Sequence, residues 1–423
     1  MRFTRREFIR GGVSAFTVGF AAPAFLSDIA RAQGASRRNL VVLYLGGGND
    51  ALSTVIPYTD PFYRSRRPTV QVAPGTEIQI GSDTSGKPLA LHPRLTGLRQ
   101  IFDAGDLAII QRTGYPNQSR SHFLGTDIWN TALPGNVVGS GWLGRYLDTL
   151  PDPIDPLSGW VAQRDVPRAL IGNEVSVPAI PNPATYAFAS PNPNVPNEPL
   201  YARQAMTSIA SHLPVDQPHL AFVNGTTQAA LATLDRVNSV ATYAPSVTYG
   251  GDGLSQAFRA VAGAIVRGIG TRVFWVSTGG YDTHATQNTN AANAGYGQLM
   301  NIINNAITTF YNDIRNQGLL NDTLILQFSE FGRRVSQNGS DGTDHGAGGI
   351  MMAIGGNVNG GLYGTAPNLQ PIAGNTTLEN NFGDVAHETD FRSVYARVLD
   401  TWLGVNSVQI LNGDYRKPSL NFI

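Results

Sequence analysis

Carboxylate and imidazole side chains stand close together at two places in this sequence. Asp282 and His284 are separated by one residue, and Asp344 directly precedes His345 in a glycine-rich stretch. In an extended segment, residues i and i+2 point to the same side, so Asp282 and His284 could reach one ion. Imidazole nitrogens and carboxylate oxygens are common ligands of divalent metals. The two pairs therefore predict one or two divalent metal ions. The first pair could instead be a surface histidine beside a turn aspartate, and the second could belong to a mobile polar loop.

Two further acids are candidate ligands. Asp50 comes one residue after three consecutive glycines, and Glu330 lies in the run Ser-Glu-Phe-Gly-Arg-Arg. Glycine lets the backbone turn tightly or approach a ligand closely, and carboxylate oxygens suit hard divalent cations. Asp50 could instead cap a helix that starts at the next residue, and Glu330 could be a general base or form an ion pair. We include both acids among the predicted metal ligands.

The run Ser119-Arg120-Ser121 could supply a nucleophile. It precedes an apolar, helix-like pattern, and the start of a helix favours anions. A metal ion could activate either hydroxyl, although helix capping is the competing interpretation. Arg120 and Arg333 are the predicted oxyanion-binding groups. The sequence does not choose between Ser119 and Ser121, and His122 makes no triad with Ser121 because no Gly-x-Ser-x-Gly elbow occurs.

Each of these polar groups lies at or near the end of a short apolar segment. Continuous apolar runs of this length are typical of strands buried on both faces. The runs are 39–45, 107–112, 273–276 and 323–328, and helical patterns occur at 93–102, 254–269, 296–314 and 389–403. The alternation predicts an α/β fold with a mostly parallel central sheet between helices. In such sheets, chemistry gathers at the carboxyl ends of the strands.

The composition divides the chain into regions. Residues 134–249 are rich in Pro, Asn and Ser, which predicts an inserted cap between core segments 33–133 and 250–423. Residues 1–32 have the grammar of a signal peptide, and Thr4 to Ile9 resemble the twin-arginine export motif. We expect recognition by the twin-arginine machinery and a periplasmic or secreted protein, with an uncleaved anchor as the alternative. The apolar run at 11–25 is too short and mild for a stable membrane span.

The overall composition excludes several functions. The 423 residues contain 30 basic and 30 acidic side chains and no cysteine. Without cysteine there are no disulfides, thiolate metal sites or cysteine nucleophiles. The formal net charge of zero provides no excess of positive charge to attract a nucleic-acid backbone, so no nucleic-acid partner is expected.

Five motifs together resemble a bacterial family of exported proteins of unknown function. They are Gly-Gly-Asn-Asp at 47–50, Arg-Ser-His-Phe at 120–123, Gly-Tyr-Asp-Thr-His at 280–284, Ser-Glu-Phe-Gly-Arg at 329–333 and Thr-Asp-His-Gly at 343–346. That family is thought to belong to the alkaline phosphatase and sulfatase superfamily. The resemblance covers nearly all of the mature chain. It implies an alkaline phosphatase-like α/β core with one or two divalent metals.

The resemblance also implies roles for individual residues. Asp50 would match the first-strand ligand, and Ser119 or Ser121 the nucleophile. Asp282 and His284 would match the ligands of the other metal, and His345 a late histidine ligand. The chain departs from the superfamily pattern in having Asp-x-His at 282–284 and Ser-Glu at 329–330. Formylglycine-type sulfatase chemistry is not expected, because the chain has neither cysteine nor Ser-x-Pro-x-Arg.

Together these patterns predict an exported, metal-dependent hydrolase of a phosphate or sulfate ester. Its substrate would be an anionic small molecule or polymer. The alternative is a non-catalytic exported protein on the same fold that binds a metal or a polymer. A metal-dependent isomerase or transferase is a third possibility.

Overall fold

The computed structural model describes residues 38–423, except 136, 152–153, 187–191, 193, 213–217, 371–373 and 380–382. The predicted signal peptide at 1–32 therefore lies outside the described residues. The core is one sheet in the order β10-β5-β9-β8-β1-β7-β6, with β13 paired to β5. Its strands are β1 (Asn39–Leu45), β5 (Leu107–Gly114), β6 (Gly159–Val161), β7 (Val273–Thr278), β8 (Thr323–Phe328), β9 (Gly349–Ile354), β10 (Gly361–Tyr363) and β13 (Thr389–Asp390).

Strand β1 lies at the centre of this sheet and is parallel to both neighbours, β7 and β8. Its alternate side chains enter different apolar clusters, Val41 and Leu43 one and Leu40 and Val42 the other. Both faces of the strand are thus covered, which explains its unbroken apolar sequence. Only the pairings of β9 in this sheet are antiparallel. The predicted α/β class with a mostly parallel sheet is confirmed.

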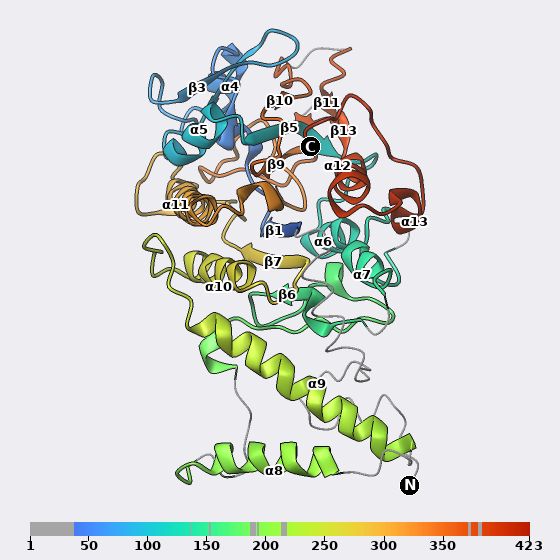
Figure 1. The fold of residues 1–423 in the computed structure, drawn as a ribbon. Helices are drawn as coiled ribbons and strands as arrows, with labels where there is room; N and C mark the ends of the chain where they lie inside the picture. The colour runs from blue at the N-terminus through green and yellow to red at the C-terminus, as the bar shows by residue number, and fades with distance from the viewer. Residues whose placement is uncertain are drawn as a thin grey trace.

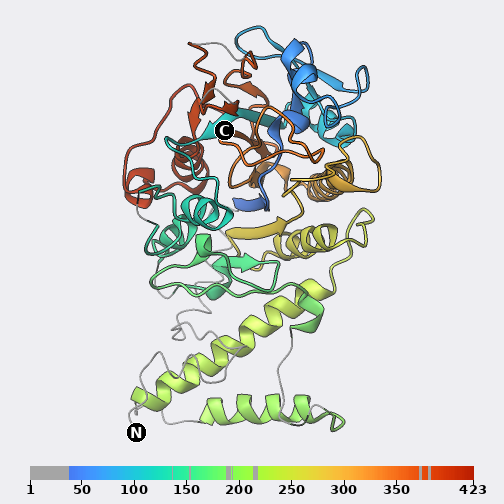
Figure 2. The same ribbon diagram turned by 180° about the vertical axis from the view of Figure 1, so that it is seen from behind.

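Helices cover both faces of the sheet (Figures 1 and 2). One face carries α5 (Thr96–Asp103), α10 (Gly253–Arg267) and α11 (Gly295–Asn316). The other carries α6 (His122–Thr131), α7 (Trp142–Leu147), α12 (Phe391–Arg397), the π-helical turn η5 (Val398–Leu403) and α13 (Ser407–Leu411). The helices predicted at 93–102, 254–269 and 296–314 are present, with bounds shifted by a few residues.

The direction of β9 shapes the edge where the carboxyl ends of the parallel strands meet. Strand β8 ends at that edge, and β9, being antiparallel to β8, begins there. The connection 329–348 therefore stays at one edge instead of crossing a face of the sheet. It carries Glu330, Arg333, Asp344 and His345 to the ends of β1, β5 and β7.

Smaller elements complete the body. A three-stranded sheet has the order β2-β4-β3, and β11 pairs with β12. The bounds are α3 (Ala51–Thr54), β2 (Val55–Ile56), α4 (Pro61–Arg66), β3 (Ile78–Ser82), β4 (Pro88–Leu91), η1 (Pro156–Ser158), η2 (Arg168–Leu170), η3 (Pro183–Thr185), η4 (Leu320–Asp322), β11 (Leu378–Glu379) and β12 (Asp384–Val385).

The segment predicted as an inserted cap, 134–249, is divided between two places. Strand β6 lies within it and pairs in parallel with β7, so this part belongs to the central sheet. Helices α8 (Glu198–His212) and α9 (Pro218–Ala241) instead form an arm that projects beyond the β6 edge (Figures 1 and 2). Within the described part of the chain, no helix combines the length and apolar character needed to cross a membrane.

Candidate functional site

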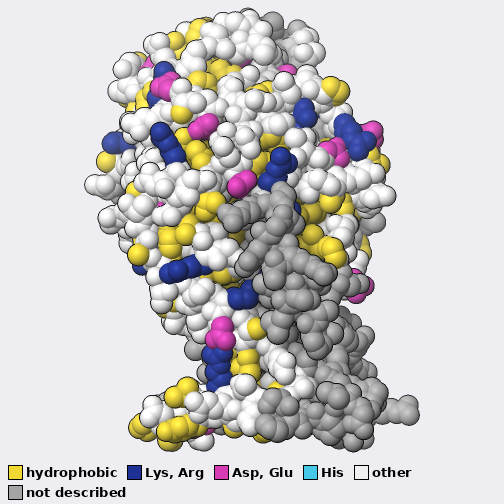
Figure 3. Space-filling view, viewed as in Figure 1, with side chains coloured by type: hydrophobic (Ala, Val, Ile, Leu, Met, Phe, Trp, Pro, Cys, Tyr) yellow, Lys and Arg dark blue, Asp and Glu magenta, His cyan; other side chains and the backbone are white. Residues whose placement is uncertain are grey.

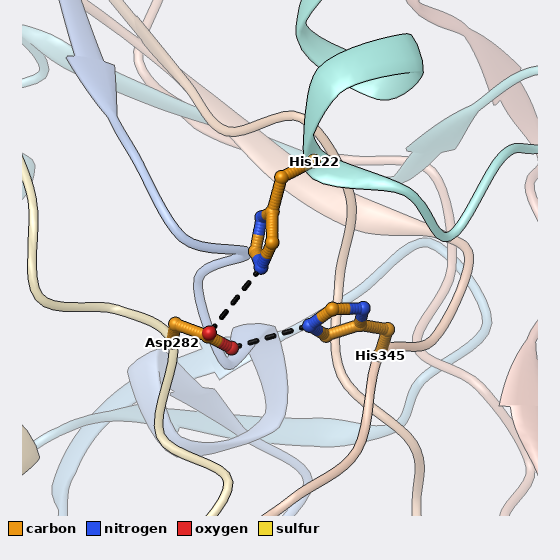
Figure 4. A group of neighbouring side chains, drawn as sticks. All are labelled: His122, Asp282 and His345. Atoms are coloured by element: carbon orange, nitrogen blue, oxygen red, sulfur yellow. Dashed lines mark hydrogen bonds and ion pairs between the residues drawn. The ribbon is translucent and has the colours of Figure 1, made fainter.

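Three side chains from distant parts of the chain meet at the carboxyl edge of the sheet (Figure 4). His122 Nε2 lies 3.4 Å from one oxygen of Asp282, and His345 Nε2 lies 3.1 Å from the other. The ligand atoms of the three residues all lie within 4.8 Å of one another. His122 is the first residue of α6, Asp282 follows β7, and His345 belongs to the β8–β9 connection.

His284 joins this group from the segment after β7. Its Nε2 lies 3.2 Å from Asp282 Oδ1 and 2.8 Å from His345 Nε2. We refer to His122, Asp282, His284 and His345 as the His/Asp cluster. The side chains of Asp282 and His284 are 49% and 43% exposed, so the cluster is open to solvent.

The second ring nitrogen of each histidine in the cluster has an oxygen acceptor. His122 Nδ1 lies 2.8 Å from Glu330 Oε1, and His345 Nδ1 lies 2.7 Å from the carbonyl oxygen of Arg120. His284 Nδ1 lies 3.3 Å from Asp344 Oδ1. Carbonyl and carboxylate oxygens only accept hydrogen bonds, so we assign the proton of each neutral ring to Nδ1. Each Nε2 then carries a lone pair.

In this assignment the lone pairs face one another and a carboxylate, an arrangement that a positive charge between them would stabilise. His122 Nε2 is buried and has no hydrogen-bond partner. His284 Nε2 and His345 Nε2 cannot bond to each other if both are unprotonated. A divalent cation satisfies all four groups at once, and an oxygen acceptor on the outer nitrogen is the usual setting of a metal-bound histidine. Nitrogen and oxygen ligands of this kind suit zinc, iron, manganese or cobalt.

The protonation states favour cation binding. Burial opposes ionisation of Asp282, but the hydrogen bond from Arg333 and its positive charge outweigh burial and lower the pKa of Asp282 to about 2. Burial lowers the pKa of His345 below its ordinary value. At neutral pH the aspartate is therefore charged and His345 is neutral, the forms in which each can bind a metal.

Phe331 supports the cluster from below. Its ring centre lies 5.0 Å from that of His122 and 4.6 Å from that of His345. Gly48 makes room for it, because a Cβ at this position would stand 2.2 Å from Phe331 Cε2. Gly48 also has a φ of 74°, which strains any other residue. Gly48 of the glycine run thus provides the space that Phe331 occupies.

Arg333 does not lie where an oxyanion clamp would. Its side chain is fully buried and donates to the carbonyl oxygens of Gly47, Gly48, Tyr281 and Thr343. It also donates to Asp282 Oδ1 at 2.8 Å. With its donors directed at the protein, Arg333 joins the loops after β1, β7 and β8 and orients the carboxylate of the cluster.

Asp50 does not lie in the His/Asp cluster, contrary to the expectation that it is a metal ligand. Asp50 Oδ2 accepts hydrogen bonds from Arg67 at 2.6 Å, Ser53 at 2.6 Å and Gln287 at 2.8 Å. Both members of the Asp50–Arg67 ion pair are fully buried. The charge of Arg67 holds the pKa of Asp50 below its ordinary value despite burial. Asp50 Oδ2 is thus committed to a buried cation from the protein itself, whereas Oδ1 is buried without a hydrogen-bond partner.

Glu330 and Asp344 are held next to the cluster, not at its centre. Besides His122, Glu330 Oε1 accepts the amide of Gly47 at 2.8 Å. Asp344 Oδ1 accepts from Asn338 at 2.9 Å, and this bond lowers the pKa of Asp344. Both acids orient histidines of the cluster, a different role from the predicted ligands.

The predicted nucleophiles lie beside the cluster. Ser121 is exposed and precedes α6 without a side-chain cap hydrogen bond, and Ser119 Oγ accepts the Ser121 amide at 3.2 Å. The Arg120 guanidinium binds the buried carboxylate of Asp384. Arg120 is therefore partly neutralised, and the structure does not choose between the two serines.

Sequence reasoning missed His122. It was considered only as a triad partner for Ser121, and that arrangement does not occur. The available signal was its position after β5, at the same sheet edge as Asp282 and His345.

The fold was compared with solved structures. A crystal structure titled Ps i-CgsB has 9% identity, a TM-score of 0.37, and coverage of 91% of this chain and 74% of that chain. The same protein in complex with k-i-k-neocarrahexaose has 9% identity, a TM-score of 0.35 and the same coverage. The PsFucS1 sulfatase from Pseudoalteromonas sp. has 13% identity, a TM-score of 0.33, and coverage of 94% of this chain and 72% of that chain.

Comparison of sequences gives a firmer result. No curated protein matches the chain. One family does match, over residues 108–411, a range that includes His122, Asp282, His284 and His345. The chain belongs to this family, which is described as a protein of unknown function, DUF1501.

Proposed function

We propose that this protein is an exported, divalent-metal-dependent hydrolase of a phosphate or sulfate ester. The observation that carries the proposal is the convergence of His122, Asp282 and His345, whose ligand atoms all lie within 4.8 Å of one another. His284 Nε2 lies 3.2 Å from Asp282 Oδ1, and every Nδ1 of the three histidines is held by an oxygen acceptor. The ester class rests on the resemblance of the five motifs, and export rests on the pattern of residues 1–32.

The cluster would hold one ion through its three Nε2 atoms and an oxygen of Asp282. A bound divalent ion would polarise an ester oxygen and make a hydroxyl or water a stronger nucleophile at neutral pH. The chain's own part is to keep the imidazoles oriented through Glu330, Asp344 and the Arg120 carbonyl. Ser121 directly precedes His122 in the sequence, and Ser119 lies two residues before Ser121.

An anionic substrate group has partners at the rim of the cluster. The side chains of Arg120 and Arg334 are 37% and 41% exposed. Arg334 Nη1 stands 3.7 Å from Asp344, the acceptor of His284. Half-exposed guanidinium groups beside a cation favour phosphate or sulfate over a neutral ester.

A second candidate function is a structural metal site without catalysis. Four protein ligands would complete a tetrahedral shell, which is typical of structural zinc. The exposure of Asp282 and His284 favours the catalytic alternative, because substrate could approach them from solvent.

The test is metal content and turnover of the protein purified without chelator, beside His122→Ala and Phe123→Ala. Phe123 follows His122 in α6 and is 89% exposed, so its variant is a control for the effect of an alanine substitution in this part of the helix. We expect one equivalent of metal in wild type and Phe123→Ala, its loss in His122→Ala, and hydrolysis of an aryl phosphate or sulfate only by metal-loaded protein. Metal without turnover, coupled to a lower melting temperature on chelation, would support the structural site. Absence of metal from the wild type, with no gain in melting temperature on adding zinc or manganese, would refute both.

A further inference from the structure

Gln287 is a buried amide whose hydrogen-bonding capacity is fully used. It is fully buried, and its Nε2 donates to Asp50 Oδ2 at 2.8 Å and to Thr289 Oγ1 at 3.2 Å. Its Oε1 accepts from Thr283 Oγ1 at 3.0 Å and from Thr343 Oγ1 at 2.8 Å. An amide side chain has two donors and two acceptor positions, and here all four are occupied.

The two threonines belong to the segments that carry the His/Asp cluster. Thr283 stands between Asp282 and His284, and Thr343 is two residues before His345. The segments are also joined directly, because the Thr343 amide donates to the Thr283 carbonyl at 2.9 Å. Gln287 therefore binds, through one oxygen atom, both segments whose spacing determines where the ligands meet.

The buried ion pair below fixes the orientation of this amide. Asp50 can only accept hydrogen bonds, so the NH2 end of Gln287 must face it and the carbonyl end must face the threonines. Asp50 is itself anchored by Arg67, whose guanidinium also donates to the carbonyls of Arg334 and Val335. The side chain thus connects a rigid buried ion pair to the candidate metal site.

We propose that Gln287 is a positioning residue for this site. It sets the spacing between the 282–284 and 343–345 segments. That spacing determines the metal affinity and the ligand geometry of the cation site. The inference rests on the proposed metal site. It assigns Asp50 and Arg67 a part in that site without contact with the metal.

The test compares Gln287→Met with Asn304→Leu in the full chain. Asn304 is a matched control, because it is a buried amide whose Oδ1 accepts the Gly97 and Leu98 amides, away from the cluster. Both variants lose buried hydrogen bonds, and we expect both melting temperatures to fall. Only Gln287→Met should weaken zinc affinity, by roughly 10-fold or more in competition with a chromogenic chelator. It should also change the visible absorption bands of bound Co²⁺, which report ligand geometry.

A second pair covers the possibility that Gln287→Met does not fold. Thr343→Val removes one hydroxyl from the Gln287 oxygen, whereas Thr343→Ser keeps it. Thr343→Val should weaken zinc binding, whereas Thr343→Ser should retain the wild-type zinc affinity and the wild-type Co²⁺ spectrum. Wild-type affinity and spectrum in folded Gln287→Met, or in Thr343→Val, would overturn the inference alone. Absence of zinc and cobalt binding by the wild type would instead overturn the proposed function, and this inference with it.

Discussion

The hydrogen-bond partner of one ring nitrogen determines where the other nitrogen of a histidine points. In this protein Glu330 and the Arg120 carbonyl hold His122 and His345 with their Nε2 atoms toward Asp282. His92 shows the contrast. Its Nε2 donates to the Thr289 carbonyl at 2.9 Å, and its Nδ1 accepts the Arg94 amide at 3.2 Å. Both nitrogens of His92 are satisfied by the backbone, so this ring is structural.

The burial of His92 predicts a pH dependence of stability. Burial lowers the pKa of His92 to about 4, from an ordinary value of 6.5. Its contribution is therefore fully present above pH 6.5 and is lost as the pH falls toward 4, because only the unfolded chain takes up the proton in that range. The loss is about 3 kcal/mol. Urea unfolding of the chelator-treated protein between pH 7 and 4.5 should show a smaller decline for His92→Gln than for wild type. Parallel declines would contradict the assignment.

Individual residues also mark what the sequence could predict about the site. Asp282, His284 and His345 were singled out because acid and imidazole lie close together in the chain. Asp50 was grouped with the metal ligands because its ion-pair partner Arg67 lies 17 residues away, and sequence spacing does not indicate that the two side chains meet in the fold. His122 was missed because its partner Glu330 lies 208 residues away. Local spacing finds ligands that are neighbours in sequence and not those that meet through folding.

At the scale of elements, the strands were predictable where apolar runs were long. Strands β1 and β8 have the predicted bounds, 39–45 and 323–328. Strand β6 was missed because it has three residues, Gly159–Val161, in a Pro-rich region. Its place in the sheet depends on pairing with β7, and no periodicity can develop over three residues. Long buried strands impose a sequence pattern, whereas short edge strands take their place from neighbours.

The turn after β1 predicts a substitution effect at the same scale. Gly48→Ala should destabilise the fold more than Gly86→Ala. Both glycines have positive φ, 74° and 84°, but a Cβ at Gly86 meets nothing within 4 Å. Gly86→Ala should therefore show only the left-handed strain, about 1–2 kcal/mol. Gly48→Ala adds a clash with Phe331, typically about 1–3 kcal/mol more. Urea unfolding measures the difference, and equal losses would show that Phe331 moves aside freely.

At the scale of the whole molecule, the α8–α9 arm projects from the body but is anchored in it, because Val237 and Val240 near the end of α9 belong to the apolar core. The site lies at the ends of β1, β5, β7 and β8, whereas the arm projects beyond β6 (Figure 1). Figure 3 shows apolar side chains on α8, and on the same face basic and acidic side chains are mixed without a patch of one sign. The predictions that the protein is exported and has no nucleic-acid partner stay predictions.

We expect substitutions on the exposed face of α8 to leave the His/Asp cluster unaffected. Leu200, Tyr201 and Ile209 on α8 are 52%, 61% and 62% exposed. Replacing all three with serine should leave metal content and melting temperature at wild-type values, because little apolar burial is lost. Metal analysis and thermal unfolding measure this. A loss of metal would show that the arm reaches the cluster, as the predicted cap would.

The long sequence separations within the site have a consequence for folding. The contact of His122 with Glu330 joins residues 208 positions apart. The contact of His345 with the Arg120 carbonyl joins residues 225 positions apart. Contacts between residues this far apart in sequence form late in folding, because the entropy of closing a large loop is lost before the contact contributes favourable free energy. If the proposed cation is held by all four residues of the His/Asp cluster, it would stabilise only the completed fold, because a partly folded chain does not bring all four together. Metal uptake would thus act as a checkpoint that separates completed molecules from intermediates whose sheet is still open.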